Sequence, residues 1–224
     1  VVQAGDTLSA IARMYKVSIG TLRKVNNLNL NDILVLGQLL EIPDNYLGLG
    51  PNHKLIPNSE LVYGPGQIGF NIEVSLGRWD GYLNTVSETD HRGITRNGSE
   101  IVTYVAQNYS VNPRLLLAIL EQQTGWVMGS NAGDVSQTYP FGYVKSGYKG
   151  LLRQLSWAAD MLNYGFYGWK EESLHVLDLI DGSQLAIAPG LNAGTVGMQF
   201  YFSKMYFSDA WHTIVGEGGF DRLY

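Results

Sequence analysis

Hydrophobic residues recur at helical spacing twice near the start of the chain, and an extended apolar stretch follows. Residues 8–15 carry apolar side chains three and four positions apart, behind Asp6 and Thr7, which are good helix N-caps. The same spacing over 18–25 predicts a second short helix behind a serine cap, and 33–42 is predicted to be a β-strand that ends at a proline. With a first strand at the start of the chain, the predicted order is strand, helix, helix, strand.

Helical spacing returns in the second half of the chain. Ser99 is predicted to cap a helix, and Asn112-Pro113 supplies a cap and a first-turn proline for the next one. That second helix is apolar on every side up to Glu121, which predicts that it is buried all round. A further amphipathic helix is predicted over 150–162.

The remaining segments predict a linker and a hairpin. Residues 45–60 are rich in Gly, Pro and Asn and predict a linker. Asp181-Gly182 lies between two extended runs and predicts a β-hairpin with a type I′ turn. The chain is therefore predicted to be α+β, with a small module at 1–44 and a mainly helical domain at 61–224 whose helical core begins near residue 99.

A set of short motifs spans the whole first segment. These are Gly5-Asp6-Thr7-Leu8, Ile11-Ala12, Tyr15, Val17, Leu22, Asn26, Leu28, Ile33, Gly37-Gln38, Leu40 and Ile42-Pro43. In this respect the segment resembles the lysin motif (LysM), a βααβ module that binds peptidoglycan and chitin. The resemblance implies a groove for N-acetylglucosamine units between the loop before the first helix and the loop after the second. In this sequence the groove residues are Gly5, Asp6, Thr7, Asn29, Asp32 and Ile33.

Glu121 is the candidate catalytic residue. It shares a helix face with Leu117 and Ala118, and a carboxylate on a buried face is desolvated, which favours its protonated form. The last turn of a helix also disfavours negative charge. Cleavage of a glycosidic bond needs such a protonated acid. The alternative is a surface glutamate at a helix end, which has no catalytic role.

Three motifs accompany this glutamate: the 117–121 helix end with Gly125-Trp126, the turn Tyr139-Pro140-Phe141-Gly142, and Pro189 with Asn192, Gly194 and Thr195 at a helix start. Together they resemble the lysozyme-like superfamily, in the group of lytic transglycosylases and endo-N-acetylglucosaminidases. The sequence departs from the usual Glu-Ser-Gly and Asn-Leu-Phe-Gly patterns in two of these motifs. The resemblance implies that Glu121 is a general acid. Tyr139, Tyr143, Asn192 and Tyr201 are candidate groove residues for sugar contacts, and for each tyrosine the alternative is packing in the core or on the surface.

A two-carboxylate mechanism also needs a second acid. The candidates are Asp134, Asp160 and Asp181, of which Asp160 is also interpreted as a solvated helix residue and Asp181 as a turn residue. Lytic transglycosylases, by the resemblance, use one glutamate and the C6 hydroxyl of the substrate. The absence of a clear second acid favours that route.

Composition narrows the classes of partner. A net charge of −5 argues against nucleic acid, and no apolar run is long enough for a transmembrane helix. The four histidines are scattered, no cysteine is present, and no phosphate-binding glycine loop occurs, so we expect no metal and no cofactor. Charged residues make up only 16% and tyrosines number 14, which suits contacts with sugars or with other protein copies.

Three functional classes remain open. The first is an extracellular or cell-envelope hydrolase that a LysM module anchors to peptidoglycan or another glycan containing N-acetylglucosamine. The second is a glycan-binding protein without catalysis. The third is a surface protein that assembles into a homo-oligomer or filament. A chain that starts without Met on its first predicted strand fits a secreted, mature protein.

Overall fold

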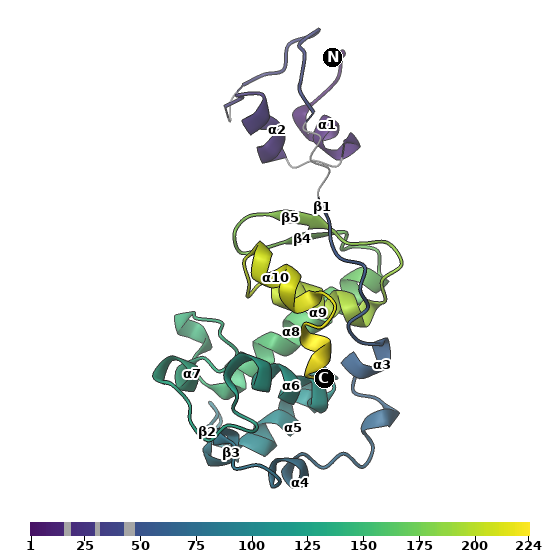
Figure 1. Ribbon diagram of the computed structural model, residues 1–224. Coiled ribbons are helices and arrows are strands. Elements are labelled where there is room, and N and C mark those ends of the chain that lie inside the picture. Colours follow the sequence, from purple (N-terminus) through teal and green to yellow (C-terminus); the bar gives the residue numbers. More distant parts are fainter. Residues whose placement is uncertain (16–18, 30–31, 43–47) are drawn as a thin grey trace. The chain divides into compact units, whose positions relative to one another are not determined.

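The computed structural model describes residues 1–15, 19–29, 32–42 and 48–224. The chain forms two compact units, the first comprising Val1–Gly50 with Gln184–Ala186 and the second Pro51–Ser183 with Ile187–Tyr224 (Figure 1). The chain is about 48% helical with small sheets, which confirms the α+β class.

The first unit contains the two predicted helices, α1 (Leu8–Met14) and α2 (Ile19–Val25). Thr7 caps α1, because its Oγ1 accepts a hydrogen bond from the Ala10 amide at 3.1 Å. The serine predicted to cap α2 lies outside the described residues. The buried core of this unit is Val2, Ile11, Ala12 and Leu22.

The strand predicted at 33–42 is wrong. Gly37 has a φ of +83°, and a tight turn forms there as the Gln38 amide donates to the Val35 carbonyl at 2.9 Å. Two backbone hydrogen bonds of 2.9 Å still join this turn to Val2, from the Val2 amide to Gln38 and from the Gly37 amide to Val2. In the described part of 1–42, the start of the chain therefore meets the 35–38 turn through these two bonds. Neither the first predicted strand nor the one at 33–42 forms there.

The second unit is mainly helical. Residues 45–60, predicted as a linker, are described from 48 onward, and Leu55 and Ile56 are buried in this unit. Its α-helices are α3 (Asn58–Leu61), α4 (Ile72–Leu76), α5 (Gly98–Tyr109), α6 (Pro113–Thr124), α7 (Asp134–Thr138), α8 (Leu151–Lys170), α9 (Ala193–Ser203) and α10 (Ser208–Val215). The strands of the chain are β1 (Gly48–Leu49), β2 (Ser87–Thr89), β3 (Thr95–Asn97), β4 (Val176–Asp178) and β5 (Gln184–Ala186).

Two small sheets form from these strands. β2 and β3 pair antiparallel with Glu88 opposite Arg96, and the second sheet has the order β1-β5-β4 with β1 parallel to β5. The predicted hairpin over 176–188 therefore forms. Its turn is not type I′, because Gly182 has a positive φ and Asp181 does not.

The helix starts around α5 and α6 follow their caps. α6 begins as predicted, with Pro113 in its first position and the Asn112 side chain accepting from the Arg114 amide at 2.9 Å. α6 is buried on several faces. Its last residue is Thr124, and the C-cap is Gly125, which has a φ of +68°. The cap of α5 is Asn97 and not Ser99, because Asn97 and Glu100 form a reciprocal capping box.

α8 and α9 make the most extensive helix contact among the described residues of the second unit (Figure 1). Gly165 of α8 faces Gly197 of α9, and a Cβ at Gly165 would lie 2.9 Å from the Gly197 Cα. α8 continues to Lys170, past the end predicted at 162, so that Gly165 lies within the helix. Trp211 and Phe220 are fully buried in the last part of the chain.

Candidate functional site

The two loops predicted to bind glycan are closed in the same way. In the first, the Gln3 amide donates to Asp6 Oδ2 at 2.7 Å and the Asp6 amide donates to the Gln3 carbonyl at 3.1 Å. In the second, the Asn29 amide donates to Asp32 Oδ2 at 2.6 Å and the Asp32 amide donates to the Asn29 carbonyl at 3.2 Å. Each aspartate therefore joins itself to the residue three positions before it through two hydrogen bonds, without any ligand.

Most of the predicted glycan residues are exposed. Gly5, at a φ of +89°, has no atom within 4 Å of the place a Cβ would take, and Ile33 is 87% exposed. Thr7, Asn29 and Asp32 are also exposed. A nearby hollow of about 230 Å³ is lined by Asp6, and not by the other five predicted residues. The described residues on both sides of these hydrogen bonds thus present solvent-facing polar and apolar groups.

Glu121 occupies the last turn of α6 and is half-buried. Its Oε2 accepts hydrogen bonds from the Val127 amide at 2.9 Å and the Met128 amide at 3.0 Å. The carboxylate therefore fastens the loop after α6 to the end of that helix. Glu121 lines neither of the two large hollows of the second unit, whose volumes are about 930 and 670 Å³.

The predicted tyrosines divide into two environments. Tyr143 stacks on Trp157 with ring centroids 4.0 Å apart, and Tyr201 lies on Trp157 at 5.8 Å. Tyr201 has no exposed surface, so no face of its ring is open to a sugar, and burial raises the pKa of its hydroxyl. Tyr139 is half-buried at the end of α7, and no aromatic partner is found for it among the described residues.

Asn192 lies in a different place from these rings. Its side chain donates to the Ile56 carbonyl at 2.7 Å and accepts from the Thr195 hydroxyl at 2.9 Å. These bonds tie the start of α9 to the segment before α3. The structure thus brings Tyr143 and Tyr201 together around Trp157 and leaves Asn192 apart from them.

Sequence reasoning missed the residue that positions the aromatic turn. Gln154 of α8 is fully buried, and its Oε1 accepts from the Phe141 and Tyr143 amides at 3.2 Å. Its Nε2 donates to the Tyr143 and Tyr148 carbonyls at 2.7 and 2.8 Å. The signal that could have identified it is a glutamine within the apolar stretch of an amphipathic helix, because a buried amide needs hydrogen-bond partners.

The second unit also contains a wide hollow that the sequence did not predict. It has a volume of about 930 Å³ and lies between the β2–β3 hairpin, α5, the 147–150 turn and the first half of α8. We call it the α5–α8 hollow. The lining residues used below are Tyr104, Tyr109, Tyr148, Lys149, Trp157 and Asp160.

The described residues contain neither a metal-binding cluster nor a membrane-spanning helix. Among the described residues, no group of three or more His, Cys, Asp or Glu side chains is placed to hold a metal ion. No helix in the described ranges has the length and apolar character needed to cross a bilayer.

These observations define an α+β protein with a small two-helix unit and a larger helical unit. The chain belongs to the family described as LasA, N-terminal domain, whose model matches residues 54–224. The model described as LysM domain matches residues 1–43. No curated protein and no solved structure was found to match the chain.

The matches confirm one resemblance and add a family that the sequence analysis did not name. The LysM prediction is confirmed, and it indicates binding to peptidoglycan or a related glycan. The helical unit falls in the LasA N-terminal family, and its likeness to lysozyme remains a prediction. LysM and LasA N-terminal domains are typical of cell-envelope or extracellular proteins.

Proposed function

We propose that this protein binds the glycan strands of the bacterial cell wall through its first unit. The observation that carries the proposal is the pair of aspartate-closed loops, at 3–6 and 29–32, within a segment that matches LysM over its whole length. Loops that are ordered beforehand lose less conformational entropy when a ligand binds. The exposed Ile33 beside the second loop offers an apolar surface to the N-acetyl methyl groups of the sugar.

The test is binding of the full chain to purified peptidoglycan and to soluble oligomers of N-acetylglucosamine. Asp32→Ala removes the acceptor for the Asn29 amide, and we expect about a tenfold loss of affinity, equivalent to roughly 1.4 kcal/mol. Glu41→Ala is the matched control, because it removes the same charge from an exposed residue of this unit that is outside both loops. Failure of the unaltered protein to bind either ligand would refute the proposal.

A second candidate function is cleavage between amino sugars with Glu121 as the general acid. It is supported by the free carboxylate oxygen, because Oε1 has no hydrogen bond to any described residue while Oε2 holds two amides. Tyr139 and Tyr143 lie on the turn after α7 and are the sugar contacts in this candidate. By the resemblance, the route is the one-glutamate transglycosylase reaction.

The catalytic candidate has a sharp test, because a glutamine side chain keeps one carbonyl oxygen. Glu121→Gln retains an acceptor for the Val127 and Met128 amides and loses the acid, whereas Glu121→Ala loses both. Catalysis predicts that Glu121→Gln unfolds like the unaltered protein and releases no soluble muropeptides. If the unaltered protein also releases none, Glu121 has a structural role only.

A further inference from the structure

We propose that the second unit has a glycan-binding site of its own in the α5–α8 hollow. At about 930 Å³ the hollow has the size of a site for a short oligosaccharide, since ligand sites span roughly 300–1,000 Å³. The site is separate from the loops of the first unit. The choice of a glycan as ligand rests on the function proposed for that unit.

One wall of the hollow is a supported aromatic surface. Trp157 stacks on Tyr143 with an angle of 4° between the rings, and Tyr148 meets Tyr143 edge-on at 4.9 Å. Gln154 fixes the turn that carries both tyrosines through the hydrogen bonds described above. Tyr148 is 37% exposed, so part of its ring is open to a ligand. Trp157 is only 6% exposed and supports this surface, so Tyr148 is the ring that presents an apolar face to the C–H face of a sugar, at little entropic cost.

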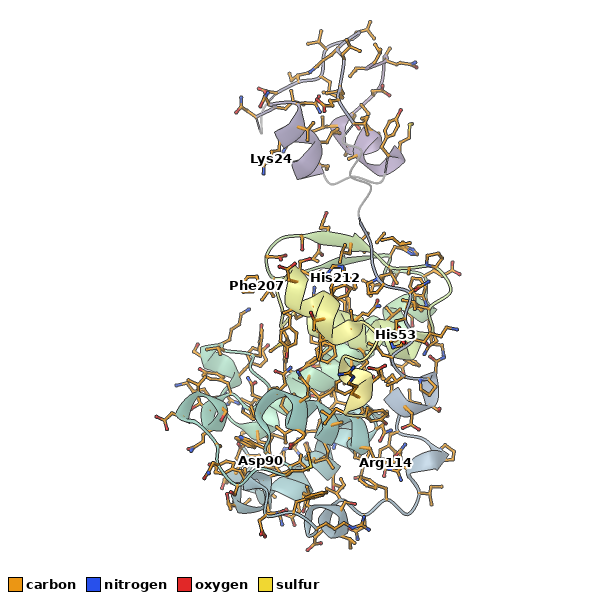
Figure 2. The ribbon with its side chains drawn as sticks, in the orientation of Figure 1. Lys24, His53, Asp90, Arg114, Phe207 and His212 are labelled. Carbon is orange, nitrogen blue, oxygen red and sulfur yellow. The ribbon has the colours of Figure 1, made fainter. Side chains whose placement is uncertain are left out.

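The part of the hollow beside the β2–β3 hairpin is held by an ion pair. Arg96 lies over the Tyr104 ring at 4.4 Å and its guanidinium is 2.7 Å from Asp90 Oδ2. Asp90 also accepts from the Arg92 and Ile94 amides, which closes the β2–β3 turn where Figure 2 labels it. Arg96 and Asp90 are therefore paired with each other, and the Arg96 guanidinium holds the Tyr104 ring in position on the hollow.

A second acid on the hollow, Glu88, is used in the same way. Glu88 accepts from the Leu151 and Leu152 amides and so caps the start of α8. It therefore leaves no free carboxylate for a ligand. The fixed charges beside the hairpin shape the hollow and do not bind in it.

Two charged side chains remain available inside the hollow. The side chains of Asp160 and Lys149 have no hydrogen bond or ion pair with any residue that the structure describes. A carboxylate accepts from sugar hydroxyls and from the N–H of an N-acetyl group, and an ammonium donates to its carbonyl. A free acceptor and a free donor beside an exposed aromatic ring match the hydroxyl and N-acetyl groups of an amino-sugar chain.

The experiment is an NMR titration of the full chain with a soluble oligomer of N-acetylglucosamine. We expect shifts at residues 148–160 as well as at 29–33. Tyr148→Ala and Asp160→Asn should weaken binding at the hollow about tenfold and leave the shifts of the first unit unchanged. Asp32→Ala should do the reverse. Asp80→Asn is the matched control, since Asp80 is exposed and does not line the hollow.

Each outcome separates this inference from the function proposed for the first unit. Shifts confined to the first unit would overturn the inference and leave that function intact. Shifts confined to 148–160 would support the inference and refute the function of the first unit. A response at 148–160 to peptide-bearing muropeptides, with none to the sugar oligomer, would identify a peptide site and overturn the inference.

Discussion

The two units differ in the size of the hydrophobic core that they build. The first packs a small core and leaves Ile33 and Leu39 87% and 80% exposed. The second buries large side chains completely, Trp211 among them, and packs α8 directly on α9. A short chain segment buries a smaller share of its surface than a long one. The difference indicates that the first unit presents a surface while the second supplies a stable helical body.

The polar contacts of the two units also differ, in the sequence separation of the residues that they join. In the first unit the loops are closed by bonds between residues three positions apart, as in Gln3 with Asp6. In the second, Asn112 donates to the Glu60 carbonyl, 52 positions away, at 2.9 Å. A hydrogen bond between residues close in sequence forms when that segment folds. A hydrogen bond between distant residues forms only when the whole unit is folded. We therefore expect damage to one unit to leave the other working.

The largest effect is expected at the contact between α8 and α9. Gly165→Val places atoms where a Cβ alone would lie 2.6 Å from the Phe200 Cβ, so the helices must separate. We expect a loss of about 3–4 kcal/mol in unfolding free energy, at the upper end for overpacking. Thermal unfolding followed by circular dichroism measures it. Gly133→Val is the control, because a Cβ there meets nothing within 4 Å.

The comparison also predicts what Gly165→Val does not change. Binding to peptidoglycan through the first unit should persist after the helical unit is destabilised, since α8 and α9 supply none of the six glycan residues predicted in the first unit. Loss of peptidoglycan binding at a temperature where the control Gly133→Val protein still binds would show that the first unit depends on the second.

A smaller effect is expected in the core of the first unit. Leu22 is fully buried, and Leu22→Ala should cost about 2–3 kcal/mol, toward the lower end for buried leucines because a small unit collapses readily around a cavity. Peptidoglycan binding should fall while the main thermal transition of the helical unit stays in place. Leu39→Ala is the control, since Leu39 is exposed. A shift of the main transition with Leu22→Ala would contradict the independence of the units.

The features that could be predicted from the sequence are those that short segments encode. Asn112-Pro113 specifies the start of α6 through one cap and one ring, and both were found in place. The LysM segment was recognised because its motif residues lie within 43 positions. Even there, the left-handed turn at Gly37 replaced a predicted strand, since periodicity does not report φ.

The features that could not be predicted depend on distant contacts. The α5–α8 hollow combines a hairpin, two helices and a turn, and Tyr104 and Trp157 meet there only after folding. Tyr201 was predicted to contact sugar, but long-range packing buries it completely. The length of α8 was also underestimated, because Gly165 indicates a helix end in the sequence and supports close helix packing in the structure.

The smallest predicted effect is the response of the β2–β3 hairpin to low pH. The hydrogen bond from Arg96, with help from the Ile94 amide, lowers the pKa of Asp90 from 3.8 to about 2. Because the folded pKa lies below the unfolded one, the stabilisation is present above pH 3.8 and is lost as the pH falls toward 2. The Arg92 and Ile94 amides should therefore shift in NMR spectra over that range. Asp90→Asn should remove this dependence, and an unaltered protein whose hairpin amides do not respond would show that Arg96 does not hold Asp90 in solution.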